Sequence, residues 1–195
     1  SHTYQLSSMP NEYNLQDRQN YSRFYPRRLQ AEVLLDSVDQ LAGSTTAFAN
    51  LPPGTRAIAL PDNSYTKASA FLKVFGRPNS ASVCECERVQ SSSLAQSLHL
   101  INSSEMKSKL ATANGRAAEL AKAKDKSVEE KVNDLYLTAF ARKPRPEELQ
   151  TAVQFLTTPD PEAKAKPDTK KTPTSKDYQD LIWALMNTKE FLFNH

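Results

Sequence analysis

Glycine and cysteine are scarce in this chain of 195 residues, which has 4 glycines and 2 cysteines against 12 prolines. So few glycines argue against many tight β-hairpins, and abundant prolines are typical of stiff helix boundaries. The chain is long enough to bury one sizeable core but short for two domains. These features predict a single, mainly α domain with proline-rich connections.

Long apolar runs and a strong net charge are also absent. No stretch reaches the roughly 18 apolar residues of a membrane-spanning helix, and the first residues lack the pattern of a signal peptide. The net charge is +3, and the lysines gather at 107–126 and 164–176, away from aromatic residues. We therefore expect no membrane span and no nucleic-acid partner. No CxxCH motif is present, so no c-type haem is covalently attached to this chain, and we expect no cofactor in it.

The spacing of apolar residues predicts a compact, irregular helical domain of about six to seven helices. An arm covers 1–25, a helical body 26–156, a loop rich in proline and lysine 157–176, and a last helix 177–195. At most one short strand is expected, at 55–60. The other predicted segments of the body are helices at 27–42, 65–75, from 93, 104–124 with a break at 114–115, 128–140 and from 146. Ser127 and Glu130 predict a capping box for the helix at 128–140, which should form a hairpin with the next helix. Trp183 is expected on the flank of the last helix, which should pack into the main core.

The arm is rich in large apolar and aromatic side chains without a regular period. We expect these residues to dock onto the helical body: Tyr4, Leu6, Tyr13, Tyr21, Phe24 and Tyr25. The alternative is that Tyr13, Tyr21 and Tyr25 stack on sugar rings. Just after the arm, Arg27 and Arg28 fall at the predicted start of the first helix, where a positive charge opposes the helix dipole. They are expected to pair with carboxylates or to face a ligand.

Most of the reactive groups lie in the segment 76–102. Cys84 and Cys86 are one residue apart, which in a strand puts their Cα atoms near the upper limit of about 6.8 Å for a disulfide. A structural disulfide therefore requires a bent turn. Two structural thiols, or a metal site completed by His99, are the alternatives that the sequence leaves open.

Charged residues surround the cysteines in the same segment. The candidates for catalysis are Arg77, Glu85, Glu87, Arg88 and His99. The carboxylates would act as acid and base, while an arginine would hold an anionic or sugar substrate. The competing interpretation is a salt-bridge network that orders an irregular loop. For His99 alone, the competing interpretation is a boundary histidine that is hydrogen-bonded to a carbonyl.

Several strings of the sequence together resemble a known family: YPRRLQAEVLLD at 25–36, RAIALPD at 56–62, FGRP at 75–78, CECER at 84–88, SLAQSLHLIN at 93–102 and DLIWALMNTKEFLFNH at 180–195. They are similar to the planctomycete-specific C-terminal domain of unknown function found in large multidomain proteins. In those proteins it often accompanies a cytochrome c module and sometimes carbohydrate-binding modules. Ser103 stands where the pattern has glycine, and the chain begins partway into the usual domain.

The resemblance implies an extracytoplasmic protein, in the periplasm or at the cell surface, but it implies no activity. Two functional classes remain. The first is a non-catalytic structural or interaction module of a larger exported envelope protein, linked to polysaccharide binding or degradation, with other domains or subunits and carbohydrate as partners. The second is an enzyme, redox or metal-binding module around the CECER loop and His99. We favour the first class, because the sequence shows no complete catalytic constellation. The sequence leaves open whether the chain is a fragment or a subunit.

Overall fold

The computed structural model describes residues 2, 5–17, 19–62, 64–65, 69–78, 96, 99–100, 102–159 and 171–194. These residues contain eight α-helices and one short 3-10 helix, which confirms the mainly α fold. In chain order the elements are α1 (Ala31–Ala42), η2 (Ala57–Ala59), α2 (Ala70–Val74), α4 (Ser104–Leu110), α5 (Arg116–Lys122), α6 (Val128–Phe140), α7 (Pro146–Thr157), α8 (Ser175–Met186) and α9 (Lys189–Leu192). Among the described helices, none is both long and apolar enough to cross a membrane.

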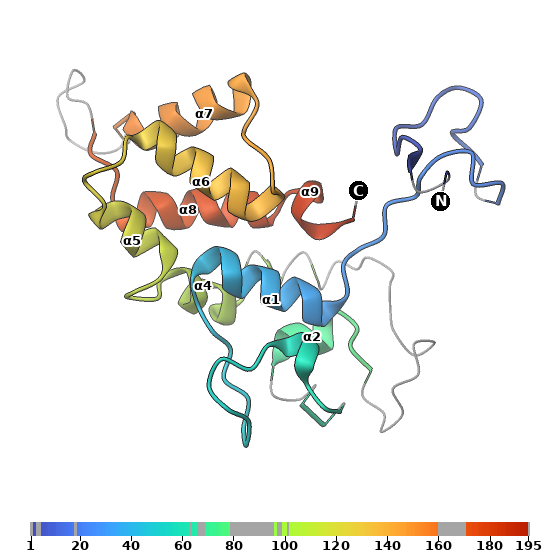
Figure 1. Ribbon diagram of the computed structural model, residues 1–195, viewed down its shortest axis with the longest axis horizontal. Helices are drawn as coiled ribbons and strands as arrows, with labels where there is room; N and C mark the ends of the chain where they lie inside the picture. Colours follow the sequence, from blue (N-terminus) through green and yellow to red (C-terminus); the bar gives the residue numbers. More distant parts are fainter. Residues whose placement is uncertain are drawn as a thin grey trace.

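Helix α1 lies at the centre of the molecule, with α2 on one side and α6 and α8 on the other (Figure 1). Its apolar residues recur at helical spacing, and Leu34, Leu35, Val38 and Leu41 are all buried. Helix α8 packs along α5 and contributes the fully buried Tyr178 and Ile182 to the same core. The prediction that the C-terminal helix packs into the main core is therefore confirmed.

The first helix begins at residue 31, so the predicted start at residue 27 was wrong. The backbone of 27–29 instead pairs with the end of the chain. Asn194 N donates to the carbonyl oxygen of Arg27 at 2.9 Å, Leu29 N donates to that of Leu192 at 3.0 Å, and an antiparallel bridge joins Arg28 to Phe193. Arg27 and Arg28 therefore do not face the N-terminal dipole of α1.

The predicted strand at 55–60 was also wrong, because this segment contains the 3-10 helix η2. The carboxylate of Asp36 on α1 accepts hydrogen bonds from Ala57 N at 2.6 Å and Ile58 N at 3.1 Å. These amides are the free donors at the start of a helical turn, and a carboxylate there satisfies them. The side chain of Asp36 thus favours a helical turn over an extended strand.

A close approach of two glycine backbones joins α1 to α5. Gly43 ends α1 with a φ of 66°, and a Cβ atom there would lie 2.7 Å from Arg116 N. A Cβ atom on Gly115 would lie 2.9 Å from the carbonyl oxygen of Ala42. Arg116 then donates from Nε to the carbonyl oxygen of Leu41 at 3.0 Å. The predicted break at Asn114 and Gly115 is therefore confirmed.

Helices α6 and α7 form the predicted helical hairpin (Figure 1). Ser127 and Glu130 make the expected capping box at the start of α6. Arg142, just after α6, binds both carboxylate oxygens of Glu148 on α7, at 2.8 and 2.9 Å, and both of Glu190 on α9, at 2.6 and 2.7 Å. One guanidinium therefore ties three helices together, a role that the sequence analysis missed.

Three residues of the arm do not dock as predicted, whereas Phe24 and Tyr25 are half-buried and Tyr4 lies outside the described residues. Tyr13 is 89% exposed, Tyr21 is 56% exposed and Leu6 also faces solvent. The arm folds on itself instead, because the carboxylate of Asp17 accepts hydrogen bonds from Gln19 N and Asn20 N, and the ring of Tyr25 packs edge-on against Tyr21. In Figure 1 the arm stands clear of the helical body.

Candidate functional site

The predicted site residues divide into those that the structure describes and those outside it. Cys84, Cys86, Glu85, Glu87 and Arg88 lie outside the described residues, as do most of the helix expected from residue 93 and most of the loop at 157–176. Arg77 and His99 are described, and they lie in two different polar clusters. Both clusters are built onto the central part of the fold.

Arg77 follows α2 and forms a buried ion pair with Glu32 in the first turn of α1. Its Nε lies 3.1 Å from Glu32 Oε1, and both side chains are about nineteen-twentieths buried, with exposures of 4% and 5%. Nη2 of Arg77 also donates to the carbonyl oxygen of Asp62 at 2.9 Å. Because this guanidinium holds a loop and a helix of its own chain, its contacts favour the structural interpretation of Arg77.

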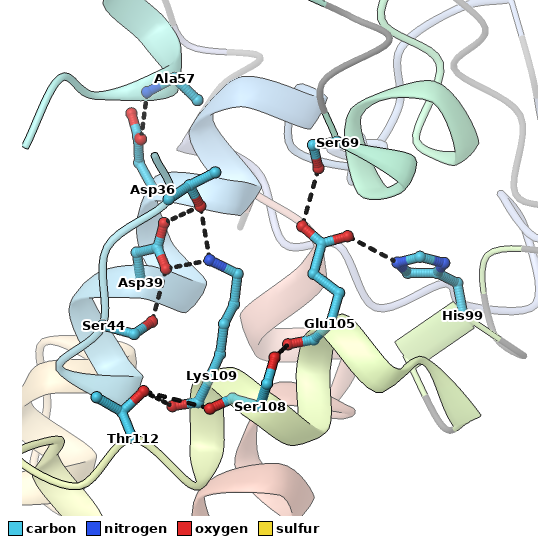
Figure 2. A network of polar contacts seen from close by, with 11 residues as sticks. Asp36, Asp39, Ser44, Ala57, Ser69, His99, Glu105, Ser108, Lys109 and Thr112 are labelled. Carbon is cyan, nitrogen blue, oxygen red and sulfur yellow. Dashed lines mark hydrogen bonds and ion pairs between the residues drawn. The ribbon is translucent and has the colours of Figure 1, made fainter. Parts of the chain in front are cut away.

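His99 lies against α2 and α4 (Figure 2). Its ring packs edge-on against Phe71 and Phe75, with centroids 5.8 and 6.3 Å away. Its Nε2 points toward Glu105 Oε2 at 3.8 Å, which is an ion-pair distance but longer than a hydrogen bond. Burial lowers the pKa of His99 below its ordinary value, and the nearby carboxylate of Glu105 opposes this in part. The neutral imidazole is therefore favoured.

Glu105 connects His99 to Ser69. The hydroxyl of Ser69 donates to Glu105 Oε1 at 2.9 Å, so the contacts run from serine to glutamate to histidine (Figure 2). A nucleophilic serine requires the histidine between the serine and the acid, because the imidazole must take the hydroxyl proton. Here the glutamate lies in the middle, so Ser69 and His99 orient the carboxylate of Glu105. Glu105 was missed from the sequence, although Ser103 immediately before α4 is its local capping partner.

A neighbouring polar cluster joins α1 to α4. Lys109 forms an ion pair with Asp39 Oδ1 at 2.5 Å and donates to the hydroxyl of Thr46 at 2.6 Å, while Ser44 and Thr46 donate to the same carboxylate (Figure 2). Each polar group of this cluster therefore has a partner within it. Among the described residues, no group of three or more histidine, cysteine, aspartate or glutamate side chains could hold a metal ion.

An apolar groove lies on a different face, between α7 and α8. It has a volume of about 760 Å³, within the range of ligand pockets. Its walls are the facing sides of α7 and α8, and Tyr136 of α6 also contributes. The residues that line it include Glu147, Thr151, Phe155, Asp180, Trp183 and Ala184.

Two large side chains leave this groove open to solvent. Phe155 is 47% exposed and Trp183 is 37% exposed, and Ala184 beside Trp183 is exposed as well. Trp183 was correctly predicted to lie on the flank of the last helix, but the groove itself was missed. Its signal in the sequence is one large apolar residue on each helix, Phe155 on α7 and Trp183 on α8, that falls outside the apolar stripe facing the core.

The fold and these sites define a mainly α-helical domain whose described polar clusters hold the chain together and whose exposed apolar groove lies elsewhere. The chain belongs to a family described as PSD1, proteins of unknown function (DUF1553), whose model matches residues 1–156. The match ends within α7, so α8 and α9, which complete the core, lie beyond it. The chain matches no curated protein and no solved structure.

Proposed function

We propose that this chain is a non-catalytic structural and interaction module of a larger exported envelope protein. The observation that carries the proposal is the apolar groove between α7 and α8, in which Phe155 and Trp183 face solvent. Contiguous exposed apolar surface of this kind marks an interaction site or a ligand-binding groove. The module docks through this groove onto a neighbouring domain or subunit.

The polar contacts of the described candidates support the same role. Arg77 is ion-paired with Glu32, and Glu105 binds Ser69 and faces His99. These groups hold α2 and α4 against α1, and a side chain that already orders the fold is poorly placed to take part in a reaction. The resemblance of the quoted motifs to the planctomycete domain supports a parent protein outside the cytoplasm, in which any haem would be carried by another module or partner.

A link to polysaccharide is the finer part of the proposal. The exposed rings of Tyr13 and Tyr21 on the arm are free to stack on sugar rings, because neither is covered by the helical body. The arm would then contact the polysaccharide while the groove contacts the protein partner. The two surfaces belong to separate parts of the chain and can be tested separately.

The second candidate is an enzyme, redox or metal-binding module around the CECER loop and His99. One observation favours it: Nε2 of His99 is buried and makes no hydrogen bond within the described residues. Such an atom can ligate a metal or accept a proton if Cys84, Cys86 or a nearby glutamate reaches it. Elemental analysis of the native protein separates the two candidates, because a stoichiometric metal lost in His99→Gln would support the second.

Fractionation of the source cells, followed by an immunoblot with an antibody against this chain, tests the proposed role. We expect the signal in the envelope fraction, in a species larger than the 21.8 kDa of this chain or bound to one. A free species of that mass in the cytoplasm would overturn the proposal. Gel retardation in soluble polysaccharide tests the arm: Tyr13→Ala with Tyr21→Ala should abolish retardation, whereas the control Ile58→Ala, also at an exposed apolar position, should not.

A further inference from the structure

The two walls of the groove are straight stripes of helical spacing. On α7 the stripe is Glu147, Thr151 and Phe155, and on α8 it is Asp180 and Ala184, with Thr188 just beyond the end of that helix. Residues four apart lie one above the other on a helix, so each stripe runs along the helix axis. A groove between two such stripes is elongated, which suits a rod-shaped occupant better than a compact ligand.

The size of the wall residues also fits a helix. Thr151, Ala152 and Ala184 are small, and the larger rings of Phe155 and Trp183 line the same groove and are partly exposed to solvent. Small side chains let two helices approach to the usual interaxial distance of about 8–10 Å. With α6, α7 and α8 already packed together, an added helix would occupy the fourth position of a small bundle.

Three uncharged polar groups of the walls, on Trp183, Thr151 and Thr188, already have partners within the chain. Nε1 of Trp183 donates to the carbonyl oxygen of Leu100 at 3.3 Å, and the hydroxyl of Thr151 donates to that of Glu147 at 2.8 Å. The hydroxyl of Thr188 donates to the carbonyl oxygen of Leu185 at 2.8 Å. A polysaccharide in this groove would find few partners for its hydroxyl groups, so the walls favour an apolar occupant.

The charges of the lining residues are all negative. They are the carboxylates of Glu147, Glu148 and Asp180. Glu148 is neutralised by Arg142, whereas Glu147 and Asp180 are exposed and form no ion pair within the described part of the chain. Two uncompensated carboxylates therefore lie on opposite walls, one on α7 and one on α8.

From these observations we propose that the groove binds an amphipathic helix of the partner, with an apolar stripe facing the groove and lysine or arginine on both flanks. The apolar stripe covers Phe155, Trp183 and Ala184, and the flanking cations meet Glu147 and Asp180. This inference rests on the proposed interaction role and names the chemistry of the partner.

The test is the binding of labelled model peptides to the whole chain, measured by fluorescence anisotropy. The probe is a peptide of leucine, alanine and lysine that places leucines at helical spacing and lysines on both flanks. The comparison peptides are the same helix with glutamate in place of lysine, and a peptide of identical composition whose leucines no longer share one face. Cellohexaose serves as the carbohydrate probe.

We expect the basic amphipathic peptide to bind at least about tenfold more tightly than either comparison peptide. The pair Glu147→Lys with Asp180→Lys should reverse the preference for charge, and Phe155→Ser should weaken binding about tenfold. The control pair Asp125→Lys with Glu129→Lys changes net charge equally at exposed positions outside the groove, and Leu137→Ser removes an exposed apolar side chain from α6. Both controls should change affinity by less than about twofold.

Equal affinity for the basic and acidic peptides, or no saturable binding of the basic peptide to the folded chain, would overturn the helix proposal. Binding of cellohexaose that Phe155→Ser abolishes would also overturn the helix proposal and would indicate a sugar site. None of these results would alter the immunoblot expected for an envelope module. The two proposals therefore fail separately.

Discussion

The α1 side of the molecule and the α7–α8 face use polar and apolar groups in opposite ways. On the α1 side, charged groups are buried and paired, as Glu32 is with Arg77 and Asp39 with Lys109. On the α7–α8 face, Phe155 and Trp183 remain exposed although their helices are well packed on the other side. Among the described residues, the buried charged groups therefore stabilise the fold, and the α7–α8 face presents an apolar surface to solvent.

This contrast changes where function is expected. Residue chemistry alone directs attention to Arg77 and His99, because charged and titratable groups are those that catalyse. Burial and contacts direct attention to the groove instead. Substitutions of the groups that hold the helices together should lower stability, most for the buried ion pair and least for His99.

Glu32→Gln should have the largest effect, because it removes the charge of a buried carboxylate that lies 3.1 Å from the guanidinium of Arg77. We expect the free energy of unfolding to fall by about 3 kcal/mol, measured by urea denaturation. The matched control is Asp134→Asn, which removes the exposed ion pair with Lys126, whose side chains are 42% and 48% exposed. The control should change stability by less than about 1 kcal/mol. Equal effects of the two substitutions would show that the Arg77 pair is not structural.

Gly115→Ala should come next, because its Cβ atom would lie 2.9 Å from the carbonyl oxygen of Ala42. The ends of α1 and α5 would have to separate, at a cost of about 2 kcal/mol. The preceding Asn114→Ala, at an exposed position, should change stability by less than about 0.5 kcal/mol. Thermal unfolding followed by circular dichroism distinguishes these outcomes, and a neutral Gly115→Ala would contradict the close approach.

Arg142→Lys should destabilise the chain by about 1 kcal/mol and reduce its loss of stability in acid, because lysine cannot bind Glu148 and Glu190 with two bonds each. Arg142 lowers the pKa of Glu148 from 4.5 to about 2. A carboxyl group whose pKa is lower in the folded state stabilises the fold above its unfolded pKa, and this contribution is lost as the pH falls from 4.5 toward 2. Urea denaturation of both proteins across that interval should show the smaller loss in the variant. An unchanged loss would assign the acid sensitivity to other carboxylates.

His99→Gln should have the smallest effect, visible mainly as a change in pH dependence. Burial lowers the pKa of His99, so the unfolded chain takes up a proton at a higher pH than the folded chain. Stability should therefore fall as the pH drops below about 6.5, and the variant should lose part of this slope. If acidification stabilises the native chain through His99, the attraction of Glu105 outweighs burial and the account of this site is wrong.

Much of the fold could be predicted because it depends on local signals. The capping box of Ser127 and Glu130, the proline at the start of α7 and the break at Gly115 are each set by a few neighbouring residues. The incorrect predictions have non-local causes. Asp36 organises η2 from α1, and the backbone at 27–29 pairs with residues at the far end of the chain.

The candidate site was less predictable for the same reason. The sequence places Arg77 and His99 in one segment, but their partners Glu32 and Glu105 come from α1 and α4. The arm shows the converse case: Tyr13 and Tyr21 resemble core residues in type, yet Asp17 turns the arm on itself and leaves both rings exposed. Residue type alone does not separate core side chains from exposed ones, and the packing shows which apolar side chains stay uncovered.

The central claim is that the α7–α8 groove is where this chain meets its partner. Its most direct test is photo-cross-linking in the source cells with p-benzoylphenylalanine at position 155, and at the exposed position 58 as the control. The account predicts that position 155 forms one specific adduct, which peptide mapping assigns to a helical segment of the parent protein or its partner, and that position 58 does not. Equal labelling from both positions, or an adduct from position 58 alone, would contradict the claim.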